Sequence, residues 1–178
     1  MDKSILRKEI KVAKSQLSAA ERRSAADSIK RRIETSELFV LAQNILLYHS
    51  LPDEVDTHRW IEDWSKSKTL FLPVVVGDTL EVRAYLSNNL HTGAYGIYEP
   101  TGEKLHDLSI LDLVIVPGVA FDRRHNRLGR GKGFYDRLLH EISAPTIGVA
   151  YNCQIVTQIP VEAHDIPLSH IFTPDAIY

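Results

Sequence analysis

The chain has 178 residues, of which 44% are hydrophobic and 25% charged, and its formal net charge is −2. A chain of this size and composition can bury an ordinary core, and its single cysteine, Cys153, excludes an internal disulfide or a thiolate metal cluster and favours a reducing compartment. The near-neutral charge excludes a surface built as a whole to attract nucleic acid, so any anion site must come from local clustering.

The first eleven residues are basic, but no apolar stretch of secretory length follows them. No segment approaches the roughly 20 apolar residues of a membrane span. We therefore expect a cytoplasmic protein that folds as one domain over residues 1–178.

Residues 3–42 have helical patterning. Ser18 and Glu21 form a capping-box pattern that predicts the start of a second helix. Most Lys and Arg side chains of this region are expected to lie on a solvated helix face. Apolar residues recur at helical spacing in the first part of the region: Leu6, Ile10, Ala13 and Leu17.

From residue 44 onward, short apolar runs alternate with helical stretches. This β-α-β order predicts a three-layer, Rossmann-like α/β fold with a mostly parallel sheet and an N-terminal helical segment. The Gly77-Asp78 turn makes the run that follows it an antiparallel neighbour, so the sheet is expected to be mixed. The expected strands are residues 45–48, 70–76, 80–86, 113–116 and 146–150, and the expected helices are residues 56–66 and 134–142.

Ligands of open α/β sheets bind beyond the carboxyl ends of the strands. The loops after Tyr48, Val116 and Ala150 are therefore expected to meet at one edge of the sheet. Residues 88–102 are interpreted as a long working loop.

Residues 117–137 form the most informative stretch, because they connect a predicted strand to a predicted helix and concentrate charge. Before the predicted helix, the stretch contains five cations: Arg123, Arg124, Arg127, Arg130 and Lys132. It also contains three alternating glycines: Gly129, Gly131 and Gly133. Glycines let the backbone approach a ligand closely and direct successive N–H groups into a concavity that suits phosphate. The spacing matches neither the mononucleotide P-loop nor the dinucleotide fingerprint.

A flexible basic loop or a single-stranded RNA contact would also explain Gly-Arg repeats. Its position between a buried strand and a helix favours an anion site instead. Asp136, in the first turn of that helix, can stabilise the helix end or, beside bound phosphates, hold Mg²⁺.

Residues 127–136, Arg-Leu-Gly-Arg-Gly-Lys-Gly-Phe-Tyr-Asp, follow Pro-Gly-Val-Ala-Phe-Asp at 117–122. Together they resemble the signature of the 5-formyltetrahydrofolate cyclo-ligase family. The resemblance covers nearly the whole chain, because the basic first helix, Asp53-Glu54, residues 96–100 and residues 160–165 occur in the family's order.

The resemblance implies an ATP-binding loop, which we name the glycine loop, at residues 127–135. It contains Arg127, Leu128, Gly129, Arg130, Gly131, Lys132, Gly133, Phe134 and Tyr135. Arg130 and Lys132 would be catalytic, next to the transferred phosphate. Lys3 and Arg7, which share one helical face, match the basic pair that reaches the ATP phosphates in the family.

By the same resemblance, Asp136 and Asp165 would hold Mg²⁺. The residues implied to bind the folate are His49, Leu51, Glu54, Tyr95, Arg130 and Tyr135. Glu54 would accept hydrogen bonds from pterin N–H groups, although it could instead cap the following helix. His49 departs from the expected aliphatic residue, and a hydrogen-bonded core histidine is the alternative for it.

The implied reaction is the ATP- and Mg²⁺-dependent cyclisation of 5-formyltetrahydrofolate to 5,10-methenyltetrahydrofolate, with release of ADP and phosphate through a phosphorylated formyl intermediate. The expected partners are ATP and a reduced folate, with no nucleic acid or membrane, and the expected state is a monomer. Two alternatives stay open: an ATP-dependent small-molecule kinase and, ranked below it, a nucleic-acid-binding module. A relative that kept the fold and changed its activity is a further one.

Overall fold

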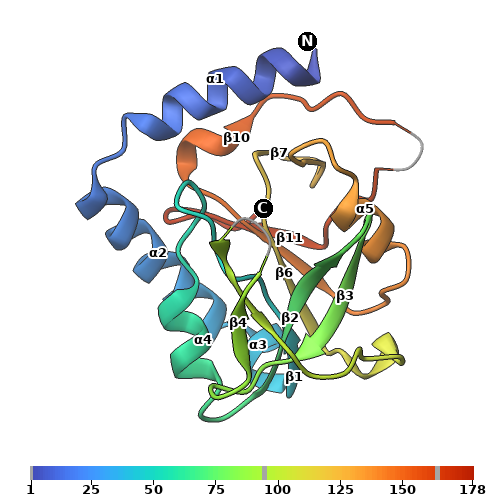
Figure 1. Cartoon of the computed structure of the whole chain (residues 1–178). Helices are drawn as coiled ribbons and strands as arrows, with labels where there is room; N and C mark the ends of the chain where they lie inside the picture. The colour runs from blue at the N-terminus through green and yellow to red at the C-terminus, as the bar shows by residue number, and fades with distance from the viewer. Residues whose placement is uncertain (1, 94–95, 163–164) are drawn as a thin grey trace.

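A six-stranded sheet forms the centre of the protein, with strand order β11-β9-β6-β1-β2-β3 (Figure 1). The structure is a computed structural model that describes residues 2–93, 96–162 and 165–178. All neighbouring strands pair in parallel except β2 and β3, which form an antiparallel hairpin. The strands are β1 (Asn44–Leu46), β2 (Thr69–Val76), β3 (Thr79–Ala84), β6 (Leu113–Val116), β9 (Thr146–Val149) and β11 (His170–Phe172). The mixed, mostly parallel sheet is therefore confirmed.

Helices precede the sheet and alternate with its strands. The α-helices are α1 (Lys3–Ser15), α2 (Ala19–Glu34), α3 (Glu37–Leu41), α4 (His58–Trp64) and α5 (Phe134–Leu139). Short 3₁₀ helices are η2 (Leu108–Ile110) and η3 (Asn152–Gln154). The predicted capping box opens α2: the Ser18 hydroxyl accepts from the Glu21 N–H at 3.2 Å, and Glu21 Oε2 accepts from the Ser18 N–H at 2.7 Å. Among the described residues, no helix combines the length and apolar character needed to cross a membrane.

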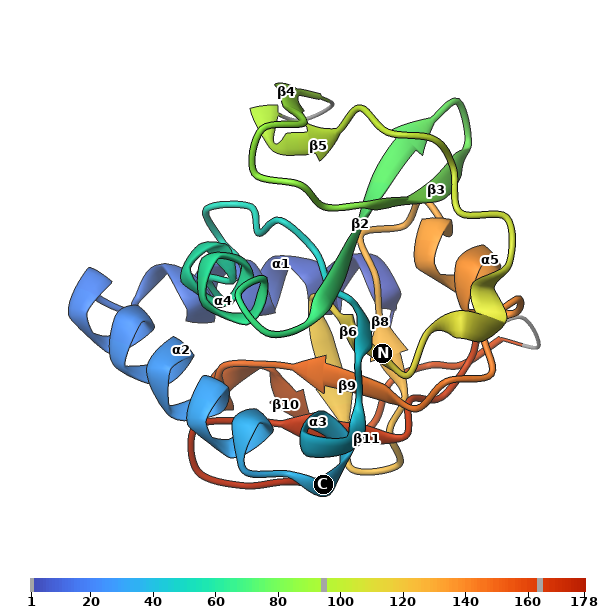
Figure 2. The ribbon, with the colours of Figure 1, turned by 90° about the horizontal axis from the view of Figure 1, so that it is seen from below.

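Both faces of the sheet are covered (Figure 2). Successive strand residues point to opposite faces, so Ile45 packs beneath α2, α3 and α4 while Leu46 faces α5. Ile29 and Trp60 are buried on the first face, and Leu138 of α5 is buried on the second. This arrangement confirms the three-layer α/β fold.

Short strands occur where the sequence predicted loops. Residues 88–102, interpreted as a long working loop, contain an antiparallel pair, β4 (Leu90–Thr92) and β5 (Tyr98–Pro100), so the segment is not a loop throughout. The Glu99 carboxylate of β5 is buried and accepts a hydrogen bond from the Val75 N–H at 3.3 Å. Strands of three residues with polar side chains carry too little periodicity to be recognised.

The connection from β6 to α5 is also not direct. It contains β7 (Ala120–Asp122) and β8 (Arg127–Leu128), which join β10 (Ile155–Val156) in a second sheet of order β10-β7-β8. The carboxylate of Asp122 is fully buried and accepts hydrogen bonds from the N–H groups of Asn126 and Ile159. Side-chain bonds to distant backbone thus stabilise a hairpin that sequence periodicity does not reveal.

α1 lies across the end of the molecule at which β7 and β10 are found (Figure 1). Its apolar face, with Leu6 and Ile10, packs against Ala120, Leu128 and Ile159. The basic residues of α1 are thereby placed next to the loops that follow the parallel strands.

Candidate active site

A cavity of about 290 Å³ opens beyond the carboxyl ends of β1 and β6. The chain continues from β1 to β2 on one side of the sheet, and later returns to β6 on the other side. Such a reversal of strand order is the point at which open α/β sheets bind ligands. Tyr48 and His49 follow β1, and Pro117 and Gly118 follow β6; all four line the cavity.

The third predicted loop, after Ala150, contacts a residue of the cavity wall without lining the cavity itself. The Tyr151 hydroxyl donates a hydrogen bond to the backbone oxygen of Glu54 at 2.9 Å. The expected meeting of three loops is therefore correct, although the third does not line the cavity.

Most of the predicted site residues come together at this cavity. Those on its wall are His49, Leu51, Glu54, Arg127, Gly129, Arg130, Lys132, Gly133, Phe134, Tyr135 and Asp136. Lys3, Arg7, Leu128, Gly131 and Asp165 do not line it. Tyr95 lies outside the described residues.

Arg127 and Asp136 close the two ends of the glycine loop. The Arg127 side chain is 4% exposed, and its Nη2 donates to Asp136 Oδ1 at 2.5 Å. Its guanidinium carbon lies 5.6 Å from the centre of the Tyr135 ring. Gly133, with a φ of +67°, allows the left-handed turn that starts α5. Burial, and then the Glu54 carboxylate, raise the pKa of Tyr135 far above its ordinary value, so its hydroxyl stays protonated.

Two further contacts fix the glycine loop against its surroundings. Arg7 Nε donates to the backbone oxygen of Gly129 at 2.8 Å. On the other side, Arg137 Nη2 donates to the backbone oxygens of Lys132, at 3.0 Å, and Asp78. The loop is therefore held between α1 and the β2–β3 turn.

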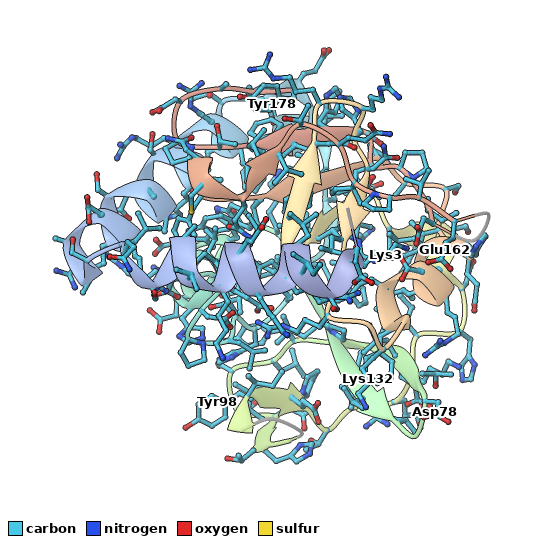
Figure 3. The ribbon with its side chains drawn as sticks, turned by 90° about the horizontal axis from the view of Figure 1, so that it is seen from above. Lys3, Asp78, Tyr98, Lys132, Glu162 and Tyr178 are labelled. Atoms are coloured by element: carbon cyan, nitrogen blue, oxygen red, sulfur yellow. The ribbon has the colours of Figure 1, made fainter. Side chains whose placement is uncertain are left out.

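Lys132 is exposed and lies between α1 and the turn that contains Asp78 (Figure 3). Its ammonium group makes no hydrogen bond or ion pair with another described residue. A cation that lines a cavity and lacks an internal partner can accept an anionic ligand without first breaking an ion pair.

Arg130 faces two carboxylates from the loop after β1. Its Nη2 donates to Asp53 Oδ1 at 2.5 Å and to Glu54 Oε1 at 3.1 Å, and its Nε donates to Glu54 Oε1 at 3.3 Å. The other oxygen of Glu54, Oε2, accepts from the Leu51 N–H at 2.9 Å. Glu54 thus shapes the cavity wall, and it does not cap α4, whose first turn is bonded by Asp56 instead.

Lys3 connects α1 to the predicted metal residue of the late loop. Its Nζ donates to Asp165 Oδ2 at 2.8 Å and forms an ion pair with Glu162 Oε1 at 2.9 Å (Figure 3). Within the described ranges, no group of three or more His, Cys, Asp or Glu side chains is arranged to hold a metal ion. Asp136 and Asp165 are each joined to a cation of this chain.

His49 does not have the environment of a hydrogen-bonded core histidine. Its ring lies 4.0 Å from the His58 ring and 5.5 Å, edge-on, from the Tyr98 ring. Its Nδ1 is buried and has no hydrogen-bond partner among the residues the structure describes. Burial, followed by repulsion from His58, lowers the pKa of His49 to about 4, so the ring is neutral near pH 7.

Several residues of the site were missed by sequence reasoning. Lys14 pairs with Asp53 beside Arg130, but a lysine in a basic amphipathic helix is typical of a solvated face. An apolar wall, made of Pro73, Val75, Leu80 and Ile97, also lines the cavity. Apolar residues of this kind do not differ in sequence from core residues, so no signal could have distinguished them.

The fold and the cavity define an α/β enzyme whose site combines an apolar wall with a cationic loop. Comparison with protein families identifies the family of this enzyme: the model described as the 5-formyltetrahydrofolate cyclo-ligase family matches residues 1–174. The chain therefore belongs to the 5-formyltetrahydrofolate cyclo-ligase family, and it is an enzyme of the ligase class.

Individual relatives agree with this assignment. The chain is 33% identical over 176 residues to the 5-formyltetrahydrofolate cyclo-ligase of Haemophilus influenzae, covering 93% of this chain and 94% of that protein. It is 36% identical over 158 residues to the enzyme of the same name from Escherichia coli, covering 83% and 86%. The NMR structure of Aquifex aeolicus 5,10-methenyltetrahydrofolate synthetase superposes with a TM-score of 0.90 at 35% identity, covering 99% of this chain and 92% of that one.

Proposed function

We propose that this enzyme uses ATP and Mg²⁺ to cyclise 5-formyltetrahydrofolate to 5,10-methenyltetrahydrofolate through a phosphorylated formyl intermediate. The observation that carries the proposal is that the cations Arg130 and Lys132, the carboxylate of Glu54 and a group of apolar residues from β2 and β3 line the same cavity. A phosphate tail needs a cationic surface. A flat, partly apolar heterocycle with N–H donors needs an apolar surface with a hydrogen-bond acceptor beside it.

The chemistry explains why ATP is needed. The N5-formyl group is an amide, so its carbon is a poor electrophile and its oxygen a poor leaving group. Attack of the formyl oxygen on the γ-phosphorus forms an O–P bond and releases ADP. N10 then attacks the activated carbon, and the C–O bond breaks with departure of phosphate and loss of the N10 proton.

The cations of the glycine loop would compensate the charge of the transferred phosphoryl group. Phosphoryl transfer depends mainly on positioning and electrostatic stabilisation, and it needs no nucleophilic side chain. Lys132 would contact the phosphate directly, and Arg130 would do so through its Nη1 N–H groups, which have no partner among the described residues.

The folate would occupy the part of the cavity between Glu54 and the apolar residues of β2 and β3. Glu54 presents a carboxylate that can accept N–H hydrogen bonds from the pterin. Val75 and Leu80 offer apolar contact to its ring. Holding N10 next to the activated carbon is a proximity effect that can lower the barrier by as much as about 7–11 kcal/mol.

Asp136 and Asp165 would hold Mg²⁺. Both offer carboxylate oxygens, the ligand type that Mg²⁺ prefers, and Mg²⁺ in nucleotide sites takes only one or two carboxylates together with phosphate oxygens and water. A site with few protein ligands therefore fits this ion. When bound, Mg²⁺ would neutralise phosphate charge and favour the leaving of ADP.

The test is to mix the purified protein with 5-formyltetrahydrofolate and follow the absorbance of the methenyl product, with and without ATP and with Mg²⁺ or a chelator. We expect product only when both ATP and Mg²⁺ are present. Methenyl formation without ATP would refute the phosphorylated intermediate. ADP formation with a stable phosphorylated product and no methenyl absorbance would indicate a kinase instead.

A further inference from the structure

Asp53, which does not itself line the cavity, is bonded to two cations from different parts of the fold. Its Oδ2 accepts from Lys14 Nζ at 2.7 Å, and its Oδ1 accepts from Arg130 Nη2 at 2.5 Å. Lys14 also donates to the backbone oxygen of Asp53 at 2.8 Å. One carboxylate thus joins α1 to the glycine loop.

Lys14 holds the Asp53 carboxylate in a fixed position. The residue is only 3% exposed, and a buried ammonium is costly unless it is paired. Both hydrogen bonds that its ammonium group donates to described residues go to Asp53, one to the side chain and one to the backbone. Burial opposes ionisation of Asp53, but the bonds from Lys14 and Arg130 outweigh it and lower the pKa of the carboxyl below its ordinary value.

Arg130 needs such a fixed point because its side chain is 46% exposed. An exposed arginine samples many rotamers, and ordering it costs conformational entropy. Asp53 and Glu54 together engage Nε and Nη2, so the guanidinium is oriented while Nη1 keeps its N–H groups for a ligand. Arg130 donates to Oε1 of Glu54, and a bound pterin would also donate its N–H hydrogen bonds to the Glu54 carboxylate.

We propose that Asp53, anchored by Lys14, is a positioning residue that keeps the Arg130 guanidinium at the cavity wall during phosphoryl transfer. It acts when the folate engages Glu54, because Asp53 is then the remaining carboxylate that fixes Arg130. The inference rests on the proposed function for the role of Arg130, and Asp53 itself touches neither substrate.

A double-mutant cycle tests whether Asp53 acts through Arg130. We expect Asp53→Ala to lower kcat/KM for ATP about tenfold in the native background, and less than about twofold in an Arg130→Ala background. Equal losses in the two backgrounds would overturn the proposal. Asp53→Asn, which keeps the shape and one acceptor oxygen, serves in place of Asp53→Ala if the latter does not fold.

Asp63 provides a matched control. Its carboxylate also pairs with two lysines, Lys30 at 2.6 Å and Lys66 at 3.0 Å, but on α4 and away from the cavity. Asp63→Ala removes the same type of ion pair, and we expect kcat/KM for ATP to stay unchanged. A tenfold loss in this control would show that the effect at Asp53 is a general one on the fold, and would overturn the assignment.

A second readout does not depend on activity. In protein labelled with ¹⁵N-arginine, the Arg130 Nε–H signal is identified as the one missing in Arg130→Lys. With 5-formyltetrahydrofolate bound and ATP absent, so that the folate engages Glu54, we expect its exchange with solvent to become about fivefold or more faster in Asp53→Ala and to stay unchanged in Asp63→Ala. Unchanged exchange in Asp53→Ala overturns the positioning role, whereas absence of ATP-dependent product in the native enzyme overturns the proposed function alone.

Discussion

Arg127 Nη2 and Asp136 Oδ1 lie 2.5 Å apart, so a single ion pair joins the first residue of β8 to the first turn of α5. This ion pair therefore holds the two ends of the glycine loop together, and the residues between them form the exposed part of the loop. This arrangement lets exposed residues such as Lys132 hold a defined place without being buried.

Asp136→Asn separates the structural and the metal-binding roles of this carboxylate. The amide oxygen can still accept the Arg127 bond, so we expect the free energy of unfolding to fall by only about 1–2 kcal/mol. The anionic ligand is lost, so the Mg²⁺ concentration for half-maximal activity should rise about tenfold or more. The measurement is a Mg²⁺ titration of methenyl formation. Asp107→Asn, at the start of the distant η2, is the control, and superimposable titrations of Asp136→Asn and the native enzyme would exclude Asp136 from the metal site.

Lys132→Ala should lower turnover by about 100-fold, because a charge-assisted hydrogen bond to phosphate is worth roughly 1.5–3 kcal/mol. The side chain is exposed and has no internal partner in the described part of the chain, so the thermal unfolding midpoint should not change. Lys11→Ala removes an exposed lysine of α1 that is not part of the cavity wall, and it should retain full turnover. Native turnover in Lys132→Ala would remove this residue from catalysis.

Gly131→Ala tests the backbone of the glycine loop. Gly131 has a φ of +97°, and Gly77 in the β2–β3 turn has a φ of +56°. An added Cβ is strained at both positions, at a cost of roughly 1–2 kcal/mol in stability. We expect Gly131→Ala to lower both stability and kcat/KM for ATP, and Gly77→Ala to lower stability alone. Equal kcat/KM values for the two variants would mean that the loop conformation does not contribute to nucleotide binding.

The neutral ring of His49 predicts a pH dependence of stability. The pKa falls from an ordinary value of 6.5 to about 4 in the folded protein, chiefly through burial. Between these two values the unfolded chain binds a proton that the folded protein does not, so stability is lost as the pH falls through this window.

His49→Leu removes this titration and leaves the other groups in place. Urea unfolding at pH 7 and pH 5 should show a smaller loss of stability in the variant than in the native protein. An identical loss in both proteins would contradict the lowered pKa.

The parts of the fold that were predicted from the sequence are those with a long or repeated pattern. Residues 45–48 and 113–116 are fully apolar, buried runs that contain β1 residues and β6, and Ser18 with Glu21 carries its own local signal. β4, β7 and β8 were not predicted, because each has two or three residues and is stabilised by partners distant in the chain. Long-range hydrogen bonds, such as those of Asp122, leave no periodic trace.

The site follows the same division. The glycine loop was recognised because alternating glycines and cations between a strand and a helix form a dense local motif. Lys14 was not recognised, because its burial depends on how α1 docks and on a carboxylate 39 positions further on. Tertiary contacts determine that Lys14 is buried, whereas the composition of the helix alone predicts a solvent-exposed lysine.

α1 is attached to three separate loops by three basic side chains: Lys3 to Asp165, Arg7 to the oxygen of Gly129, and Lys14 to Asp53. At a rise of 1.5 Å per residue, these anchors are spread over about 17 Å of one stiff rod. Because a helix barely stretches, sliding or tilting it displaces all three loops together. The loops around the cavity therefore share one mechanical support. A displacement of the first turn of α1 would also shift Asp53, which is bonded to the last turn of the same helix.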